Sequence, residues 1–336
     1  MQKRVLNLLL TGVALIPLWS LAARPYTPTS IEPVLEPWRW HEMTALSGRG
    51  VLCVDEAPDG ALWFGGVGGV LRYDGMQAEW MPFDARLKTA IGMDQNRKPW
   101  CRSLLCMQDG GLLAVLETTL LEWRAGVWRI LQSGLGTVEY NTRLVRGGDG
   151  AVWLLESQGL WRYSADLQQH EYVFGAKPGE RTVAFCLDGK GDAWVVLDTP
   201  HADTELIHIP FHEGKALAPA AWRRYPIEGT GYSREASICA GPDGKICFVN
   251  SKGDGKIRFL EPGSGTWSVL DKPETKTGYF SLFKDRHGTL WAGGAGSLLA
   301  AREEGCAFFS SVVLGFPSVP VSVFEAKNGW CRMRQR

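Results

Sequence analysis

The sequence lacks an excess of charge of either sign, because its 36 lysines and arginines balance 36 aspartates and glutamates. A nucleic-acid-binding protein typically shows a basic surplus or a basic stripe, so this balance argues against that class. The sequence also lacks a Cys-x-x-Cys pair, a P-loop, a His-Glu-x-x-His motif and the spacing of a nucleophile elbow. These absences argue against a zinc ribbon, a phosphate-binding loop, a zinc protease and an α/β-hydrolase, and we expect no cofactor.

Long apolar runs are missing except at the N-terminus. A short basic region at Gln2–Arg4 precedes the uncharged apolar run Val5–Trp19, and Ser20–Ala23 offers the small residues of a cleavage site. This pattern predicts a signal peptide over residues 1–23 and therefore a periplasmic or secreted protein. An uncleaved N-terminal anchor is the alternative, although the apolar run is short for a membrane span of about 20 residues.

The eight cysteines of an exported chain raise the question of disulfides. Four of them lie in short apolar runs, where a small buried hydrophobic residue would serve equally well. These four are Cys53, Cys106, Cys186 and Cys239. We therefore expect free, buried thiols.

Glycine and tryptophan are abundant, with 40 glycines and 15 tryptophans. A turn glycine recurs about every 45 residues, a period typical of propeller blades. These glycines are Gly60, Gly110, Gly150, Gly191, Gly244, Gly288 and Gly329. A tryptophan follows closely in four repeats, as Trp63, Trp153, Trp194 and Trp291. Residues 51–83 read as four short strands joined by tight turns, which is one blade of a β-propeller.

The repeat predicts an all-β fold, a β-propeller of four-stranded antiparallel blades over residues 46–336. We expect six complete blades and a partial seventh, with residues 321–326 and 330–333 as the first strand and part of the second. Residues 24–45 form an N-terminal segment whose stretch 37–43 resembles a ring-closing outer strand. The fourth repeat carries an insertion at residues 199–220. The repeated glycines and tryptophans are interpreted as structural.

The segment Asp59-Gly-Ala-Leu-Trp-Phe-Gly-Gly-Val-Gly-Gly-Val-Leu-Arg-Tyr-Asp-Gly75 resembles the two-component regulator propeller repeat. Arg286-His-Gly-Thr-Leu-Trp-Ala-Gly-Gly294 and Gly148-Asp-Gly-Ala-Val-Trp153 match it more loosely, and the resemblance covers residues 36–336. It implies the periplasmic sensor region of bacterial hybrid histidine kinases and related regulators. On that resemblance we expect a non-catalytic sensing or interaction domain. Whether the chain is a short form of a longer sensor is left open.

Arginines at or just before the innermost strand of five repeats are the candidate ligand-binding residues. They are Arg49, Arg102, Arg143, Arg181 and Arg234. That strand lines the central channel of a propeller, so guanidinium groups converging at one mouth would suit carboxylate, sulfate or phosphate groups. Four aromatic residues nearby could stack on sugar rings: Trp100, Tyr140, Tyr232 and Tyr279. Alternatively, these arginines pair with neighbouring acids or face solvent.

These residues predict a small-molecule or acidic oligosaccharide ligand, or a protein partner on a propeller face, and no nucleic acid. Contact with a membrane would come only through an uncleaved N-terminus or a missing C-terminal region. The alternative function is an exported propeller lyase or hydrolase acting on a glycan or small molecule. It would need a histidine or tyrosine base beside an acid, and only His287 lies in a repeat turn. A metal site at His201, His208 and His212 is conceivable, but we expect an ordinary strand there.

Overall fold

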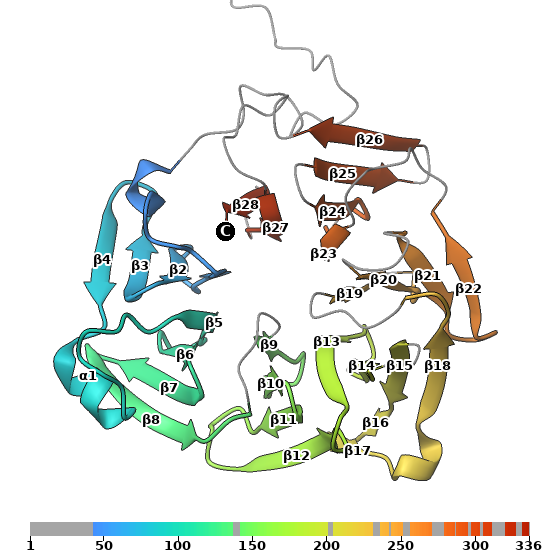
Figure 1. The fold of residues 1–336 in the computed structure, drawn as a ribbon, viewed down its shortest axis with the longest axis horizontal. Helices are drawn as coiled ribbons and strands as arrows, with labels where there is room; N and C mark the ends of the chain where they lie inside the picture. Colours follow the sequence, from blue (N-terminus) through green and yellow to red (C-terminus); the bar gives the residue numbers. More distant parts are fainter. Residues whose placement is uncertain are drawn as a thin grey trace, which may run out of the picture.

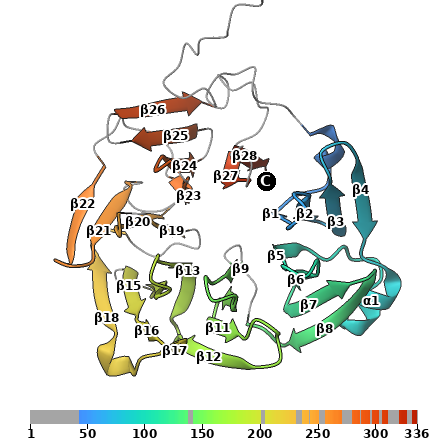
Figure 2. The same ribbon diagram turned by 180° about the vertical axis from the view of Figure 1, so that it is seen from behind.

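The computed structural model describes residues 43–136, 142–200, 204–230, 236–241, 243–250, 256–270, 279–285, 287–294, 297–302, 305–310, 320–326 and 331–335. Within this part of the chain, six four-stranded antiparallel sheets surround a common axis (Figure 1). In each sheet the four strands follow one another in chain order from the axis outward (Figure 2). This is the predicted β-propeller.

The strands of the first three blades come from the first half of the chain. Blade 1 contains β1 (Cys53–Glu56), β2 (Leu62–Gly66), β3 (Gly69–Tyr73) and β4 (Ala78–Pro82). Blade 2 contains β5 (Cys101–Cys106), β6 (Leu112–Leu116), β7 (Thr119–Arg124) and β8 (Val127–Ser133). Blade 3 contains β9 (Arg143–Arg146), β10 (Val152–Glu156), β11 (Gly159–Tyr163) and β12 (His170–Gly175).

The next three blades continue round the ring. Blade 4 contains β13 (Arg181–Leu187), β14 (Ala193–Asp198), β15 (Thr204–Ile209) and β18 (Arg223–Ile227). Blade 5 contains β19 (Ala236–Ala240), β20 (Ile246–Asn250), β21 (Arg258–Glu261) and β22 (Thr266–Val269). Blade 6 contains β23 (Tyr279–Lys284), β24 (Leu290–Gly294), β25 (Ser297–Arg302) and β26 (Gly305–Ser310).

A two-stranded sheet of β27 (Pro320–Glu325) and β28 (Cys331–Gln335) lies between blades 6 and 1, close to the axis (Figure 1). The β27 strand contacts β23 and β24 of blade 6. On its other side, Phe324 and Ala326 pack against Leu62 and Phe64 of blade 1. Side-chain packing therefore joins the segment 320–326 to the first blade.

The turn between the first and second strands of each blade depends on glycine. The six turn glycines that lie in the described segments have φ between 79° and 86°, a conformation that side chains rarely adopt. They are Gly60, Gly110, Gly150, Gly191, Gly244 and Gly288. The predicted turn period is therefore confirmed for six repeats, while Gly329 lies outside the described residues.

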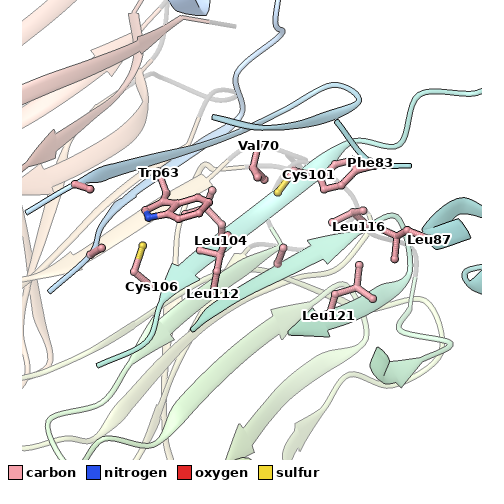
Figure 3. Packing of buried hydrophobic residues seen from close by; sticks show 13 residues of the cluster. Trp63, Val70, Phe83, Leu87, Cys101, Leu104, Cys106, Leu112, Leu116 and Leu121 are labelled. Atoms are coloured by element: carbon pink, nitrogen blue, oxygen red, sulfur yellow. The ribbon is translucent and has the colours of Figure 1, made fainter. Parts of the chain in front are cut away.

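The hydrophobic core is divided into clusters, and each cluster lies between two neighbouring blades. Trp63 of blade 1, for example, packs with Leu104 and Leu112 of blade 2 (Figure 3). Trp153 and Trp194 are at most 2% exposed in the equivalent interfaces, and Trp291 is fully buried. Burying one indole removes about 200 Å² from water, worth several kcal/mol as an upper estimate. The tryptophans therefore hold neighbouring blades together, as their repeat positions predict.

Among the described residues, three short helical elements lie outside the blades. Residues Thr44–Leu46 and Pro219–Ala221 form 3-10 turns, and α1 (Ala85–Ala90) links blades 1 and 2. The Asp84 carboxylate accepts a hydrogen bond from the Leu87 amide at 2.7 Å and so caps α1.

Blade 4 carries its extra residues later than predicted. The expected insertion at residues 199–220 includes β15, which is the regular third strand of the blade. The inserted part is the small hairpin of β16 (Phe211–His212) and β17 (Lys215–Ala216). Its Phe211 ring packs on Trp153 of blade 3 at 5.0 Å between centroids. The hairpin therefore covers the boundary between blades 3 and 4.

Candidate functional site

Four of the five predicted binding residues lie at one end of the ring, where the innermost strands begin. Arg143 and Arg181 are the first residues of β9 and β13, Arg102 is the second residue of β5, and Arg49 lies shortly before β1. Arg234 lies outside the described residues. The strand bounds therefore place these residues at the same end of the ring on different blades, and convergence of their side chains at the mouth stays a prediction.

Arg49 and Arg102 each lie against a tryptophan ring. The Arg49 guanidinium carbon is 4.2 Å from the ring centroid of Trp80, and that of Arg102 is 4.5 Å from the centroid of Trp100. Such cation–π contacts are worth about 0.5–1 kcal/mol at partly exposed sites. Both arginines are half-buried. These two guanidinium groups are therefore oriented by indoles of their own surroundings.

Arg143 occupies a position at which the other blades carry a small residue. Pairing with the second strand defines this position in every blade. Its other occupants are Cys53, Ser103, Ala184, Ser237 and Ser281. A long cationic side chain at a position built for small residues cannot be explained by the packing of the repeat. Arg143 is therefore the strongest candidate for a specialised role.

The surroundings of Arg143 combine exposure to solvent with close protein neighbours. Its side chain is exposed although it belongs to an innermost strand. Loss of hydration among these neighbours lowers the pKa of the guanidinium, while the Cys186 and Cys239 thiols act in the opposite direction. These thiols belong to β13 and β19, the innermost strands of the next two blades. The charge of Arg143 therefore lies within electrostatic reach of thiols from blades 4 and 5.

At this same small-residue position, two serines join neighbouring blades. The Ser103 hydroxyl accepts a hydrogen bond from the Leu144 amide at 2.8 Å, joining blades 2 and 3. The Ser237 hydroxyl accepts from the Leu282 amide at 3.0 Å, joining blades 5 and 6. In blade 3 the charged side chain of Arg143 replaces the serine hydroxyl that accepts such a hydrogen bond between blades. This replacement is consistent with a role other than holding blades together.

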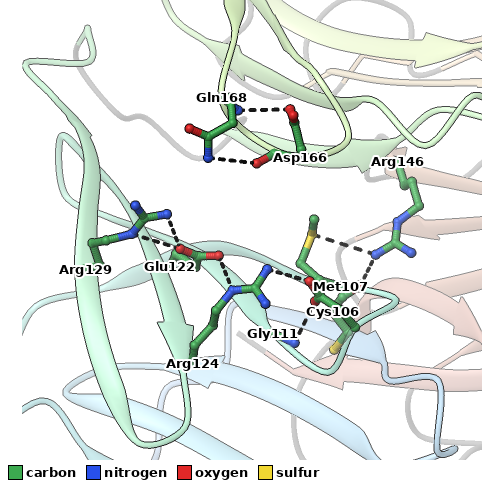
Figure 4. A network of polar contacts seen from close by, with 10 residues as sticks. Cys106, Met107, Gly111, Glu122, Arg124, Arg129, Arg146, Asp166 and Gln168 are labelled. Atoms are coloured by element: carbon green, nitrogen blue, oxygen red, sulfur yellow. Dashed lines mark hydrogen bonds and ion pairs between the residues drawn. The ribbon is translucent and has the colours of Figure 1, made fainter.

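A second polar chain crosses blades 1 to 3 nearer the other end of the innermost strands. The Asp55 carboxylate accepts a hydrogen bond from the Cys106 amide at 2.7 Å. The Arg146 guanidinium donates to the Cys106 carbonyl, as Figure 4 shows. Burial raises the pKa of Asp55, although these contacts oppose the shift. Sequence reasoning missed this network, because only the register brings the three residues together.

The residues that come closest to a metal site are Asp188, Asp192 and His208, whose potential ligand atoms lie within 4.8 Å of one another. Their oxygens already accept hydrogen bonds: Asp188 from Trp194 Nε1 at 3.0 Å and from two backbone amides, and Asp192 from the Phe211 amide at 2.8 Å. His208 Nε2 lies 2.8 Å from Asp192 Oδ2. This arrangement fits a hydrogen-bonded turn better than a cation site.

Two of the histidines considered for a metal site lie on separate strands, and His208 belongs to a regular strand, as expected. His208 lies on β15 and His212 on β16, so they do not share a face of one strand, and His201 lies outside the described residues. His208 instead stacks on Trp194 at 4.2 Å between ring centroids. Of the predicted stacking aromatics, Tyr279 is fully buried and Trp100 is 36% exposed, whereas Tyr140 and Tyr232 lie outside the described segments.

Comparison with solved structures places the fold among extracytoplasmic and other propellers. The extracellular domain assigned to a hybrid two-component system of B. thetaiotaomicron is similar, with a TM-score of 0.64 and 15% identity over 86% of this chain and 37% of that one. The chain thus spans well under half of that domain. Streptogramin B lyase gives a TM-score of 0.64 at 15% identity over 85% and 91% of the two chains.

A third similar structure, YCF48 bound to D1 peptide, gives a TM-score of 0.61 at 16% identity over 82% of this chain and 85% of that one. No family model matches the sequence, and no curated protein matches it either. At these identities the likeness establishes the propeller fold, which this chain shares with two-component sensor domains, with a lyase and with a peptide-binding protein. Within the described residues, no helix is long and apolar enough to cross a membrane.

Proposed function

We propose that this protein is an exported, non-catalytic sensing or interaction propeller that binds an acidic ligand at the mouth where the innermost strands begin. One observation carries the proposal: Arg143 is an exposed arginine on an innermost strand, at a position that is small in the other five blades. A guanidinium group grips carboxylate, sulfate or phosphate groups through two parallel hydrogen bonds. An acidic oligosaccharide is the ligand class that fits this chemistry.

Arg102 and Arg181 lie near the start of the innermost strands of blades 2 and 4, on either side of blade 3, and are the proposed supporting cations, with Arg49 and Arg234 as further members of the set. Because Arg49 and Arg102 are stacked on indoles, they are partly ordered before any ligand arrives. The fold shared with two-component sensor domains and with a peptide-bound propeller supports a sensing or docking role.

Calorimetric titration with a sulfated and a carboxylated oligosaccharide tests the proposal, with a neutral oligosaccharide of equal length as the ligand control. Arg143→Ala should weaken binding about tenfold or more, because a charge-assisted pair is lost. Arg143→Lys should recover only part of the affinity, since lysine cannot donate in bidentate fashion. Arg223→Ala, an exposed arginine on the outermost strand β18, is the matched control. Equal affinity of Arg143→Ala and wild type would overturn the proposal.

The second candidate function is a propeller lyase, favoured by the fold shared with streptogramin B lyase and by the His208–Asp192 pair. A histidine held by a carboxylate can act as a general base. Mass spectrometry of each candidate ligand after incubation distinguishes the two functions. A ligand that binds and remains intact supports sensing, whereas cleavage that disappears in His208→Ala supports the lyase.

A further inference from the structure

Two thiols from neighbouring blades lie close together where the innermost strands β1 and β5 meet. Cys53 Sγ on β1 and Cys101 Sγ on β5 are 3.9 Å apart, and the Cys53 thiol also donates to the Cys101 carbonyl at 3.4 Å. Cys53 is partly exposed, whereas Cys101 is fully buried in the core shared by blades 1 and 2 (Figure 3). A disulfide bond requires a sulfur–sulfur distance of about 2.05 Å, so the two side chains must rotate towards each other for a bond to form.

The backbone leaves room for both sulfurs at one particular residue. A Cβ atom placed on Gly65 would lie 2.4 Å from Cys53 Sγ and 2.6 Å from Cys101 Sγ. At the equivalent position the second strand carries Val115, Leu155, Val196 and Val249 in blades 2 to 5, and Gly293 in blade 6. Gly65 has an ordinary strand conformation, so no turn requires a glycine there, and the space that a side chain would fill is occupied by the two sulfurs.

We infer that Cys53 and Cys101 form a specific disulfide site that links the innermost strands of blades 1 and 2. The reaction is thiol–disulfide exchange with a disulfide oxidant such as oxidised glutathione. The Cys53 thiolate attacks one sulfur of the oxidant, which releases one glutathione thiolate and leaves a mixed disulfide. The Cys101 sulfur then attacks Cys53, releases the second glutathione and closes the link. The protein loses two hydrogens and two electrons, and the oxidant is reduced to two thiols.

The order of these steps follows from the surroundings of the two thiols. The hydrogen bond with Cys53, together with burial, raises the pKa of Cys101 well above its ordinary value, so its thiolate is scarce. Cys53 reaches solvent and meets the oxidant first. Once Cys53 carries glutathione, the neighbouring Cys101 is held beside it, and this proximity favours the second step.

Peptide mapping without reduction, after incubation of the folded protein with oxidised glutathione, tests the inference. Wild type should yield a linked peptide containing Cys53 and Cys101. Cys101→Ala should stop at a glutathione adduct on Cys53, and Cys53→Ala should yield neither product. Cys106→Ala, which removes another buried thiol of the same interface, should still form the link.

If a variant fails to fold, peptide mapping of the oxidised wild-type protein still decides the question. Persistence of the glutathione adduct on Cys53, or full alkylation of both thiols after oxidation, would overturn it. A further expected result is an upward shift of the thermal midpoint of the oxidised protein, reversed by dithiothreitol, because a cross-link restricts the unfolded chain. The Cys101→Ala variant should show no such shift.

Discussion

Blades 1 to 3 and blades 4 and 6 use an aspartate differently in the same turn. In blades 1 to 3 the aspartate directly precedes the turn glycine and pairs with an arginine of the third strand: Asp59 with Arg72, Asp109 with Arg124 and Asp149 with Arg162. These pairs are partly exposed; the Asp109–Arg124 pair continues to Glu122 and Arg129 (Figure 4). Exposed pairs of this kind contribute little to stability.

In blades 4 and 6 the aspartate comes three residues before the glycine and turns inward. Asp188 and Asp285 accept hydrogen bonds from backbone amides of the turn and from the indole of the following tryptophan, Trp194 at 3.0 Å and Trp291 at 2.9 Å. Asp285 is 8% exposed. One carboxylate thus joins the turn to the interblade core, whereas in blades 1 to 3 it joins the turn to the surface. The same fold tolerates both solutions because each satisfies the turn amides.

The largest difference between the two kinds of turn should appear when each aspartate is removed. Asp285→Ala leaves the Trp291 indole and two amides without their acceptor, so we expect a loss of about 3 kcal/mol or more of unfolding free energy. Asp59→Ala should cost about 1 kcal/mol or less, because its partners stay hydrated. Denaturant unfolding of both variants measures the difference, and equal losses would contradict this distinction between the turns.

An intermediate effect should come from deleting the indole donor while keeping an aromatic ring. Trp194→Phe removes packing area and also the hydrogen bond to Asp188. In blade 3 the residue equivalent to Asp188 is Gly147, which has no side chain to accept such a bond. Trp153→Phe therefore removes packing area alone. We expect Trp194→Phe to be the more destabilising variant by about 1 kcal/mol. Calorimetric unfolding of the two matched variants tests this, and a reversed order would show that ring packing outweighs the hydrogen bond.

The smallest effect is the pH dependence of the exposed turn pairs. Hydrogen bonds from the Ala61 amide and from Arg72 lower the pKa of Asp59 below its ordinary value of 3.8. The unfolded chain therefore binds the proton first as the pH falls, so the stabilisation is complete above about pH 5 and is lost through the lower folded pKa. Asp59→Asn should reduce the stability lost between about pH 6 and about pH 3 by a few tenths of a kcal/mol. An unchanged pH profile would show that the pair does not stabilise the turn.

The fold could be predicted because its signals are local. Gly150 is needed for a positive φ within one turn, and Trp153 follows at a fixed distance, so both are visible without any knowledge of other blades. The short helix α1 escaped prediction because six residues are too few to establish a period, although its cap Asp84 was a usable signal. The third strand of blade 4 was assigned to an insertion because its repeat lacks an aromatic marker there.

The site could be predicted only in outline. The positions of Arg102, Arg143 and Arg181 at the start of innermost strands follow from the repeat. Arg143 is distinguished by standing at a position that is small in the other blades, and this is visible only from the strand register of six blades. The electrostatic effect of the Cys186 and Cys239 thiols on its guanidinium depends on how the sheets are arranged around the axis. The closeness of Cys53 and Cys101 has the same origin. Such contacts depend on packing between repeats, and the residue spacing within one repeat does not predict them.

The packing of Ala326 and Phe324 against Leu62 and Phe64 also has a consequence for the order of folding. Neighbouring blades are close in the chain, so most of their interfaces can form as soon as the second blade of a pair is made. This one joins segments separated by most of the sequence and carries the largest loop-closure entropy in the ring. We therefore expect it to form last and to open first. Hydrogen exchange in β1 and β2 should then be faster than in β13 and β14, which lie far from this closing interface.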